Sequence, residues 1–200
     1  MLLGLVVAVW PPLRHTDVSV DDSLNAWVAP RPDVTTLWRV ITNALQPLTW
    51  EVLGAAAAVL LWRRRQRKLA LFVLVAIFGT VAWYDIVKVA VGRARPTVPV
   101  SLLHAQGASF PSGHATTSAV AMALVALACW QLIRRIVLRI LAVLGAVVVA
   151  AAVAFSRLAL GVHYLSDVLA AWLLAGWWVC LLIALFDMRS RQRVSRPAPR

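Results

Sequence analysis

Three short stretches hold the residues whose chemical types stand out from an otherwise apolar chain: residues 88–96 (KVAVGRARP), 110–114 (FPSGH) and 156–167 (SRLALGVHYLSD). Each lies at or near the end of a long apolar run. An ionisable residue in or beside a bilayer marks a candidate functional site, because charge is costly there. Together the stretches supply cations, two histidines, a carboxylate and a Ser-Gly turn. This set of groups suits a phosphate that must be held, attacked and released.

In the first stretch, Lys88 and Arg95 are seven residues apart, so they fall on nearly the same face of a helix that runs that far. We interpret them as a clamp on phosphate oxygens, in which Arg offers a planar fork and Lys a point charge. Arg93 lies about 140° away around that helix, and snorkelling at the membrane boundary is its favoured interpretation. Pro96 is expected to end the helix. Asp85, one turn before Lys88, either pairs with Lys88 or faces the loop.

The second stretch places Ser112, Gly113 and His114 at the start of a long apolar run. A helix N-terminus presents free backbone N–H groups and the positive end of the helix dipole, so it readily binds an anion. Gly113 lets the backbone approach a ligand closely, and Ser112 adds a hydroxyl. The alternative is a plain serine N-cap, which needs neither Pro111 nor His114.

In the third stretch, His163 and Asp167 are four residues apart, which brings their side chains together on one helix face. A carboxylate that holds one imidazole nitrogen fixes the tautomer and supports the charged form, and it leaves the other nitrogen free to attack or to take a proton. Arg157, at the start of the same loop, favours this reading over a structural His–Asp pair. Two histidines and an aspartate could also hold zinc, but three cations aimed at the same pocket would repel a dication.

The bulk composition indicates a membrane protein of one domain. The chain has 200 residues, 62% of them hydrophobic, with a mean hydropathy of +0.80. It contains ten Trp, a residue that favours the membrane–water interface. The net charge of +12 lies in short blocks rather than in a basic stripe with interleaved aromatics, which argues against nucleic-acid binding. Cys129 and Cys180 fall inside apolar runs without metal-ligand spacing and are expected to be buried fillers.

The predicted fold class is all-α, a polytopic membrane bundle of five to six transmembrane helices. The runs expected to cross the bilayer are 48–62, 69–91, 114–133, 137–155 and 165–186. Residues 1–10 are apolar but too short to span, and they lack the basic region and cleavage site of a signal peptide. Either the true start lies upstream, which is the alternative we favour, or the first span is cut short.

A single transmembrane domain is expected over residues 1–188. Within it, residues 11–46 contain several Pro breakers and are interpreted as an extracytoplasmic amphipathic segment, with a first helix along the membrane surface and a second piece near 37–45. The first helix has an apolar face of Val20, Leu24, Trp27 and Val28, and its polar positions include Asp21 and Asp22. Residues 189–200 form a basic tail that we expect to be disordered.

The basic residues predict the orientation in the membrane. Blocks at 63–68, 134–139 and 189–200 hold 13 of the 20 Lys and Arg residues. They fall on one side if each predicted span crosses once, and by the positive-inside rule that side is cytoplasmic. The three chemistry-bearing stretches then meet on the extracytoplasmic face, although they are far apart in the sequence.

Taken together, the three stretches resemble the three signature motifs of the type 2 phosphatidic acid phosphatase superfamily, which includes membrane lipid phosphatases and soluble vanadium haloperoxidases. The first motif is matched by Lys88, six residues and Arg95-Pro96, the second by residues 111–114, and the third by Ser156-Arg157, His163 and Asp167. The resemblance covers the apolar core from about residue 48 to 186. The N-terminus departs from it, because membrane members of the family usually have a full first span.

The resemblance implies a role for each matching position. His163 would be the nucleophile that forms a phosphohistidine, Asp167 would orient and charge it, and His114 would be the general acid for the leaving oxygen. The phosphoryl oxygens would be held by Lys88, Arg95, Ser112, the Gly113 amide and Arg157. The resemblance implies no cofactor and no metal, since positioned charge is the main catalytic resource for phosphoryl transfer.

The function predicted is that of a metal-independent lipid phosphate phosphatase in the plasma membrane, surrounded by membrane lipids and without a nucleic-acid partner. The favoured substrate is an undecaprenyl-type pyrophosphate, and the alternative is phosphatidic acid or phosphatidylglycerophosphate. The membrane spans disfavour a vanadate-dependent haloperoxidase. The His163–Asp167 pair and His114 disfavour a protein that only binds an anionic lipid. The sequence makes no prediction of oligomeric state.

Overall fold

The computed structural model describes residues 11–186, and over this part of the chain every regular element is a helix. In chain order the helices are α2 (Pro11–Val28), α3 (Pro32–Ala44), α4 (Pro47–Arg63), α5 (Arg67–Val91), α6 (Gly113–Leu132), α7 (Ile136–Ala159) and α8 (Leu165–Leu185). Within residues 11–186, five segments are long and apolar enough to cross a membrane, namely α3 together with α4, and each of α5 to α8. The prediction of an all-helical membrane protein with five to six spans is confirmed.

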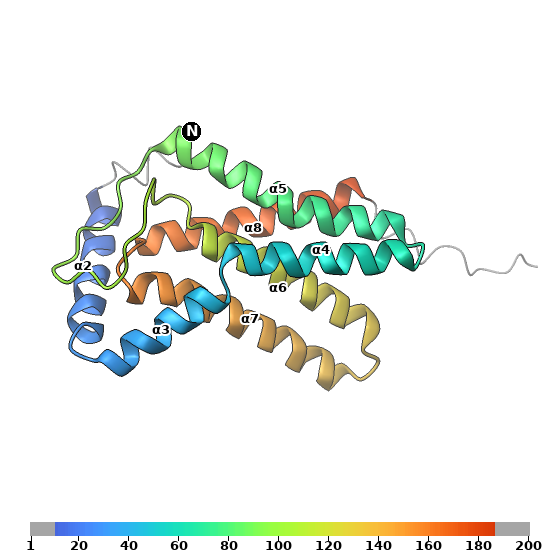
Figure 1. The fold of residues 1–200 in the computed structure, drawn as a ribbon, viewed down its shortest axis with the longest axis horizontal. Coiled ribbons are helices and arrows are strands. Elements are labelled where there is room, and N and C mark those ends of the chain that lie inside the picture. Colours follow the sequence, from blue (N-terminus) through green and yellow to red (C-terminus); the bar gives the residue numbers. More distant parts are fainter. Residues whose placement is uncertain (1–10, 187–200) are drawn as a thin grey trace, which may run out of the picture.

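The transmembrane helices form a lengthwise bundle around α6, which packs against α4, α5, α7 and α8. Figure 1 shows these helices running along the molecule, with α2 lying across one end. The buried core between them includes Trp50, Phe72, Ile77, Val120, Val179 and Leu182. The outer surface exposes large apolar side chains along every span, which suits lipid because contiguous apolar patches of this extent are rare in water.

Two contacts show how closely the spans approach one another. A Cβ at Gly54 would lie 2.9 Å from Ile77 Cγ1, and a Cβ at Gly79 would lie 2.7 Å from Trp178 Cζ2. Small residues at such crossings let membrane helices pack closely. The expectation that both cysteines are buried is wrong, because Cys180 is exposed on α8 and Cys129 is half-buried.

Local sequence signals set the helix ends that matter for the site. Pro32 and Pro47 occupy first-turn positions of α3 and α4, where a missing N–H has no cost. Gly92 ends α5 with a left-handed φ of +61°. The expected helix from Lys88 to Arg95 is therefore wrong, since the glycine stops it at Val91 before Pro96 can do so.

The helix α2 packs a largely polar face on the protein. Asp17, Asp21, Asn25 and Val28 are buried there, whereas Trp27 of the predicted apolar face is 43% exposed. The sequence did not predict that the three polar residues would be buried. This face lies on α7 and α8. Asn25 also holds the loop before α6, donating from Nδ2 to the Val100 carbonyl at 2.8 Å and accepting from the Val100 amide at 3.1 Å.

The three chemistry-bearing stretches lie at the same end of the bundle. The end of α5, the start of α6 and the turn between α7 and α8 all lie near α2, whereas the α4–α5 and α6–α7 turns lie at the far end (Figure 1). The basic residues of those two turns are thus separated from the site by the length of the spans. Our expectations for residues 1–10 and for the tail 189–200 fall outside the described residues.

Candidate active site

His163 and Asp167 lie at the turn that leads into α8. His163 is 2% exposed, precedes the N-cap residue Tyr164, and presents Nδ1 at 3.6 Å from Asp167 Oδ2. The same carboxylate oxygen accepts a hydrogen bond from the Tyr164 amide at 3.0 Å, so Asp167 also caps the helix. The pair predicted from the i, i+4 spacing is therefore close, but only Asp167 belongs to the helix.

Arg95 approaches the other side of the imidazole from the loop that follows α5. Its Nη1 lies 3.2 Å from His163 Nε2 and donates to the Val162 carbonyl at 2.8 Å. Its Nε and Nη2 donate to the carbonyls of Gly107 and Gln106 at 3.0 and 2.9 Å. Backbone carbonyls thus fix this guanidinium beside Nε2, although Arg95 does not lie on the helix that carries Lys88.

The His163 ring is held in its neutral form. Burial lowers the pKa of His163 to about 4, and the positive charges of Arg157 and Arg95 act in the same direction. The neighbouring Asp167 acts in the opposite direction, but burial outweighs the support that this carboxylate gives to the charged form. At neutral pH the ring is therefore deprotonated at one nitrogen and able to act as a nucleophile.

Arg157 lies in the last turn of α7, which continues to Ala159, and not in the loop as expected. Its side chain is almost fully buried, and its Nη1 donates to Thr42 Oγ1 of α3 at 2.7 Å. Among the described residues, Arg157 Nε has no hydrogen-bond partner. A buried guanidinium with an unused donor is suited to an anionic ligand.

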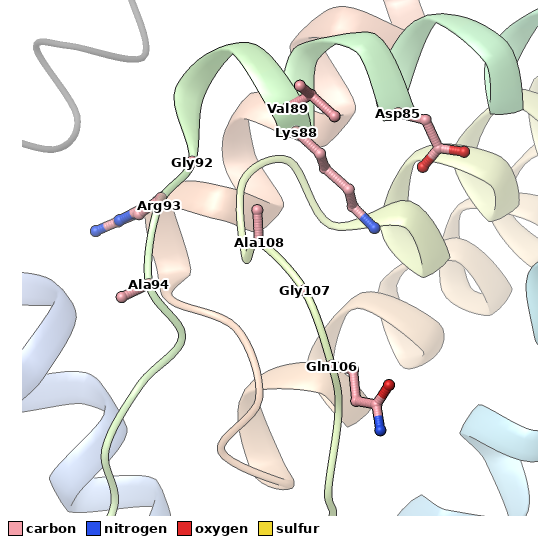
Figure 2. Close-up of a pocket in the computed structure, with 9 residues that line it drawn as sticks. All are labelled: Asp85, Lys88, Val89, Gly92, Arg93, Ala94, Gln106, Gly107 and Ala108. Atoms are coloured by element: carbon pink, nitrogen blue, oxygen red, sulfur yellow. The ribbon is translucent and has the colours of Figure 1, made fainter.

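Lys88 is the last basic residue of α5 and lies beside an aromatic ring. Its ammonium is 5.0 Å from the centre of the Tyr84 ring. It lines an open hollow of about 630 Å³ together with Asp85 and residues 106–108 (Figure 2). The hollow lies between the end of α5 and the loop before α6.

The Ser112-Gly113-His114 stretch forms the start of α6, as predicted. Ser112 is buried, and its Oγ accepts from the Ala115 amide at 3.5 Å. A Cβ at Gly113 would lie 3.2 Å from Tyr84 Cζ, so any larger residue here would require the Tyr84 ring of α5 to shift. His114 lies within electrostatic reach of Lys88, Arg157 and His163. The structure thus brings all eight predicted site residues to one end of the bundle.

Arg93 does not snorkel, and its interpretation as a boundary cation is wrong. Its guanidinium bridges two buried carboxylates, with Nη2 at 2.7 Å from Asp17 Oδ2 and Nη1 at 2.5 Å from Asp167 Oδ1. Figure 2 shows its side chain pointing away from Lys88. Burial alone would lower the pKa of Arg93, but Asp167 and Asp17 raise it above its ordinary value.

Sequence reasoning missed three residues that hold the site in place: Asp17, Thr42 and Arg93. No local signal marked Asp17, because Arg14 lies one turn before it and offers an ordinary partner on the same helix. A metal-binding cluster was another possibility, but over residues 11–186 no three His, Cys, Asp or Glu side chains gather as a metal ion would require.

The fold is that of a multi-pass membrane protein. Its polar site lies at one end of an apolar bundle and consists of cations around the buried His163. The sequence model of the PAP2 superfamily matches residues 69–191. The chain therefore belongs to the PAP2 superfamily and is a membrane phosphatase of that family, which confirms the resemblance seen in the sequence.

One solved structure carries the same fold over nearly the whole chain. It is the transmembrane PAP2-type phosphatidylglycerolphosphate phosphatase from Bacillus subtilis, with a TM-score of 0.78, 23% sequence identity, and coverage of 96% of this chain and 94% of that one. At this identity the likeness shows the fold. A search of curated proteins found no match.

Proposed function

We propose that the protein hydrolyses a lipid phosphate at the α2 end of the bundle through a phosphohistidine at His163. One observation carries the proposal: the neutral imidazole has Asp167 on its Nδ1 side and the Arg95 guanidinium 3.2 Å from Nε2. Asp167 favours a proton at Nδ1, so the Nε2 lone pair faces the cation that would hold a phosphoryl oxygen.

In the first step, Nε2 attacks phosphorus and the bond from phosphorus to the leaving oxygen breaks. Arg95, Arg157 and Lys88 balance the charge on the phosphoryl oxygens, with further donors from Ser112 and the Gly113 amide. His114 gives its proton to the leaving oxygen. In the second step, a water attacks the phosphohistidine, His114 takes the water's proton, and inorganic phosphate leaves with the imidazole restored.

The substrate we favour is a polyprenyl pyrophosphate of undecaprenyl type. Outside the spans, the site end holds α2, the segment 92–112 and the short turn 160–164, and the spans expose apolar surface along their length. A long tail can therefore stay in lipid while only the phosphate reaches the cations. A pyrophosphate brings more charge for three cations and a better leaving group. The second candidate is a glycerolipid phosphate, which the name of the structurally similar phosphatidylglycerolphosphate phosphatase favours.

The test is phosphate release by the purified protein in one detergent, with farnesyl and undecaprenyl pyrophosphates compared with phosphatidic acid and phosphatidylglycerophosphate. We expect kcat/KM to be higher for the prenyl substrates. A glycerolipid preference of about tenfold or more, equal to about 1.4 kcal/mol in the transition state, would refute the prenyl assignment and leave the phosphatase unaffected. No phosphate release from any substrate would refute the proposed activity.

We also propose that the site end faces the outside of the plasma membrane, because the basic turns lie at the other end of the spans. The test uses single cysteines at Gln66→Cys and Gln106→Cys in a background that lacks Cys129 and Cys180. An impermeant thiol reagent should label only Gln106→Cys on intact cells. Labelling of Gln66→Cys from outside would overturn the orientation.

A further inference from the structure

Asp17 is a buried carboxylate that the proposed mechanism does not use. It lies in the middle of α2, is 1% exposed, and falls outside residues 69–191 that the family model matches. Its Oδ1 accepts from the Ser166 amide at 2.9 Å, and its Oδ2 accepts from Ser166 Oγ at 2.5 Å and from Arg93 Nη2 at 2.7 Å. Two hydrogen bonds from Ser166 thus fix this carboxylate against the first turn of α8, and a third joins it to Arg93.

Arg93 connects Asp17 to the carboxylate that faces the candidate nucleophile. Its Nη1 donates to Asp167 Oδ1 at 2.5 Å and to Ser166 Oγ at 2.7 Å. Its guanidinium carbon also lies 4.2 Å from the centre of the Tyr164 ring, so the plane of the side chain is fixed. One oxygen of Asp167 therefore contacts Arg93, while the other lies 3.6 Å from His163 Nδ1.

The charges in this group explain why a second carboxylate is useful. Arg93 alone beside Asp167 would cancel the negative charge that His163 needs as positive charge develops on its ring during attack. With Asp17 present, one guanidinium is shared by two carboxylates and the group keeps a net charge of about −1. Asp17 thus lets Arg93 orient Asp167 without removing its electrostatic effect on the imidazole.

We propose that Asp17 is a positioning residue for the phosphatase reaction. It acts through Arg93 and Asp167, which orient the His163 ring and keep a net negative charge beside it. The inference rests on the proposed role of His163 as nucleophile. It gives α2 a part in catalysis, because the helix supplies a carboxylate to the site without touching the substrate.

Other charged groups also face these residues and must stay constant in a test. Arg95, Arg157 and His114 face His163 from the loop, α7 and α6. Asp21, one turn after Asp17 on α2, and Tyr164 face Arg93. Because a substitution at position 17 leaves all of them in place, a change in pH dependence reports the charge at that position.

The decisive variant is Asp17→Asn, which keeps the size and one acceptor but removes the charge. The matched control is Asp22→Asn, which removes the same charge from an exposed position on the same helix. With short-chain phosphatidic acid and farnesyl pyrophosphate in detergent, we expect Asp17→Asn to lose about 10- to 100-fold in kcat with little change in KM. In the pH profile of kcat/KM, the fall in activity on the acid side (the acid limb) should move to lower pH. The reason is that the His163 imidazole then faces less negative charge and holds its proton less tightly.

Asp17→Glu separates charge from geometry. This variant keeps the charge on a longer side chain, so we expect an intermediate kcat and an acid limb close to that of the wild type. If Asp17→Asn does not yield folded protein, Asp17→Glu decides alone: a lower kcat at unchanged KM and melting temperature supports the proposal, and an unchanged kcat overturns it.

The proposal is also overturned if Asp17→Asn behaves like Asp22→Asn, or if its activity falls in step with its melting temperature while the acid limb stays fixed. His163→Ala is assayed in parallel. Turnover that survives in His163→Ala refutes the nucleophile itself, whereas an inactive His163→Ala beside an unaffected Asp17→Asn refutes only the link through Arg93.

Discussion

The two regions that meet at the site end of the bundle supply its polar groups in different ways. The region from α5 to α8 contributes residues whose spacing already marks them, such as Arg95 and His163. The region of α2 and α3 contributes Asp17 and Thr42, which no motif marks and which contact the first region only in space. Under the proposed mechanism, the family core carries the reacting groups and the N-terminal helices orient them.

The largest expected effect falls on the core region. His163→Ala removes the candidate nucleophile, so phosphate release should drop by about 10⁴- to 10⁶-fold, to background. Steady-state phosphate release from farnesyl pyrophosphate measures this. Hydrolysis at more than a few per cent of the wild-type rate would show that another group attacks phosphorus.

A smaller effect is expected for the general acid in the same region. His114→Ala should lower kcat by about 10²- to 10⁴-fold for a lipid monophosphate, whose alcohol leaving group needs a proton. The loss should be smaller for a pyrophosphate, because its leaving group is more stable as an anion. Equal losses for both substrates would assign His114 to binding instead of proton transfer.

A change in the N-terminal region should act more weakly and at a distance. Thr42→Val removes the hydroxyl that accepts from Arg157 Nη1 at 2.7 Å, so the buried guanidinium loses its orientation and kcat/KM should fall about tenfold. The control is Thr36→Val, an exposed position on the same helix whose hydroxyl donates to the Pro32 carbonyl of that helix. Similar kcat/KM values for the two variants would mean that α3 does not orient Arg157.

The smallest effect concerns stability and not activity. Asp21 is buried, and within residues 11–186 neither of its carboxylate oxygens has a hydrogen-bond partner. Burial, followed by the charges of Asp17 and Asp167, raises its pKa from 3.8 to about 7. A carboxyl whose pKa rises on folding destabilises the folded state progressively as the pH increases between those two values, and the cost is complete above the higher one.

Asp21→Asn should therefore melt a few degrees above the wild type at alkaline pH, and the difference should shrink toward zero as the pH falls to the ordinary range of an aspartate. Thermal unfolding in detergent at several pH values measures this. Asp22→Asn, which is exposed, should show no such trend. A melting-temperature difference that is independent of pH would mean that Asp21 is not ionised on the alkaline side.

The core region could be predicted because membrane insertion and phosphate binding both require residue patterns that are local in the sequence. A span in lipid must satisfy its own backbone, so apolar runs give helices, and the predicted runs lie within a few residues of the observed α4 to α8. The cations and histidines stand out because charge is rare in such runs. The start of α6 was also readable, since Ser112 precedes the apolar run as an N-cap.

The predictions for Arg95 and Arg157 failed for the same reason: another residue pattern close by in the sequence set the end of the helix. Gly92 ended α5 before Arg95, so Arg95 reaches His163 from a loop and not from a helix face. The apolar run of α7 continued past Phe155, so Arg157 lies on a helix. In both cases the sequence identified the right arginine but assigned it to the wrong element, helix or loop.

The sequence by itself determined the helical class, the spans and the identity of the candidate reacting groups, because each depends on residues close together in the chain. Only the tertiary structure decided which face of α2 is buried. Periodicity gives no reason to bury Asp17, but the cost of burying a carboxylate is offset when a cation and hydrogen-bond donors lie against it, and Arg93 is 76 residues from Asp17 in the sequence. No local pattern contains that contact, and it is the contact that joins the N-terminal helices to His163.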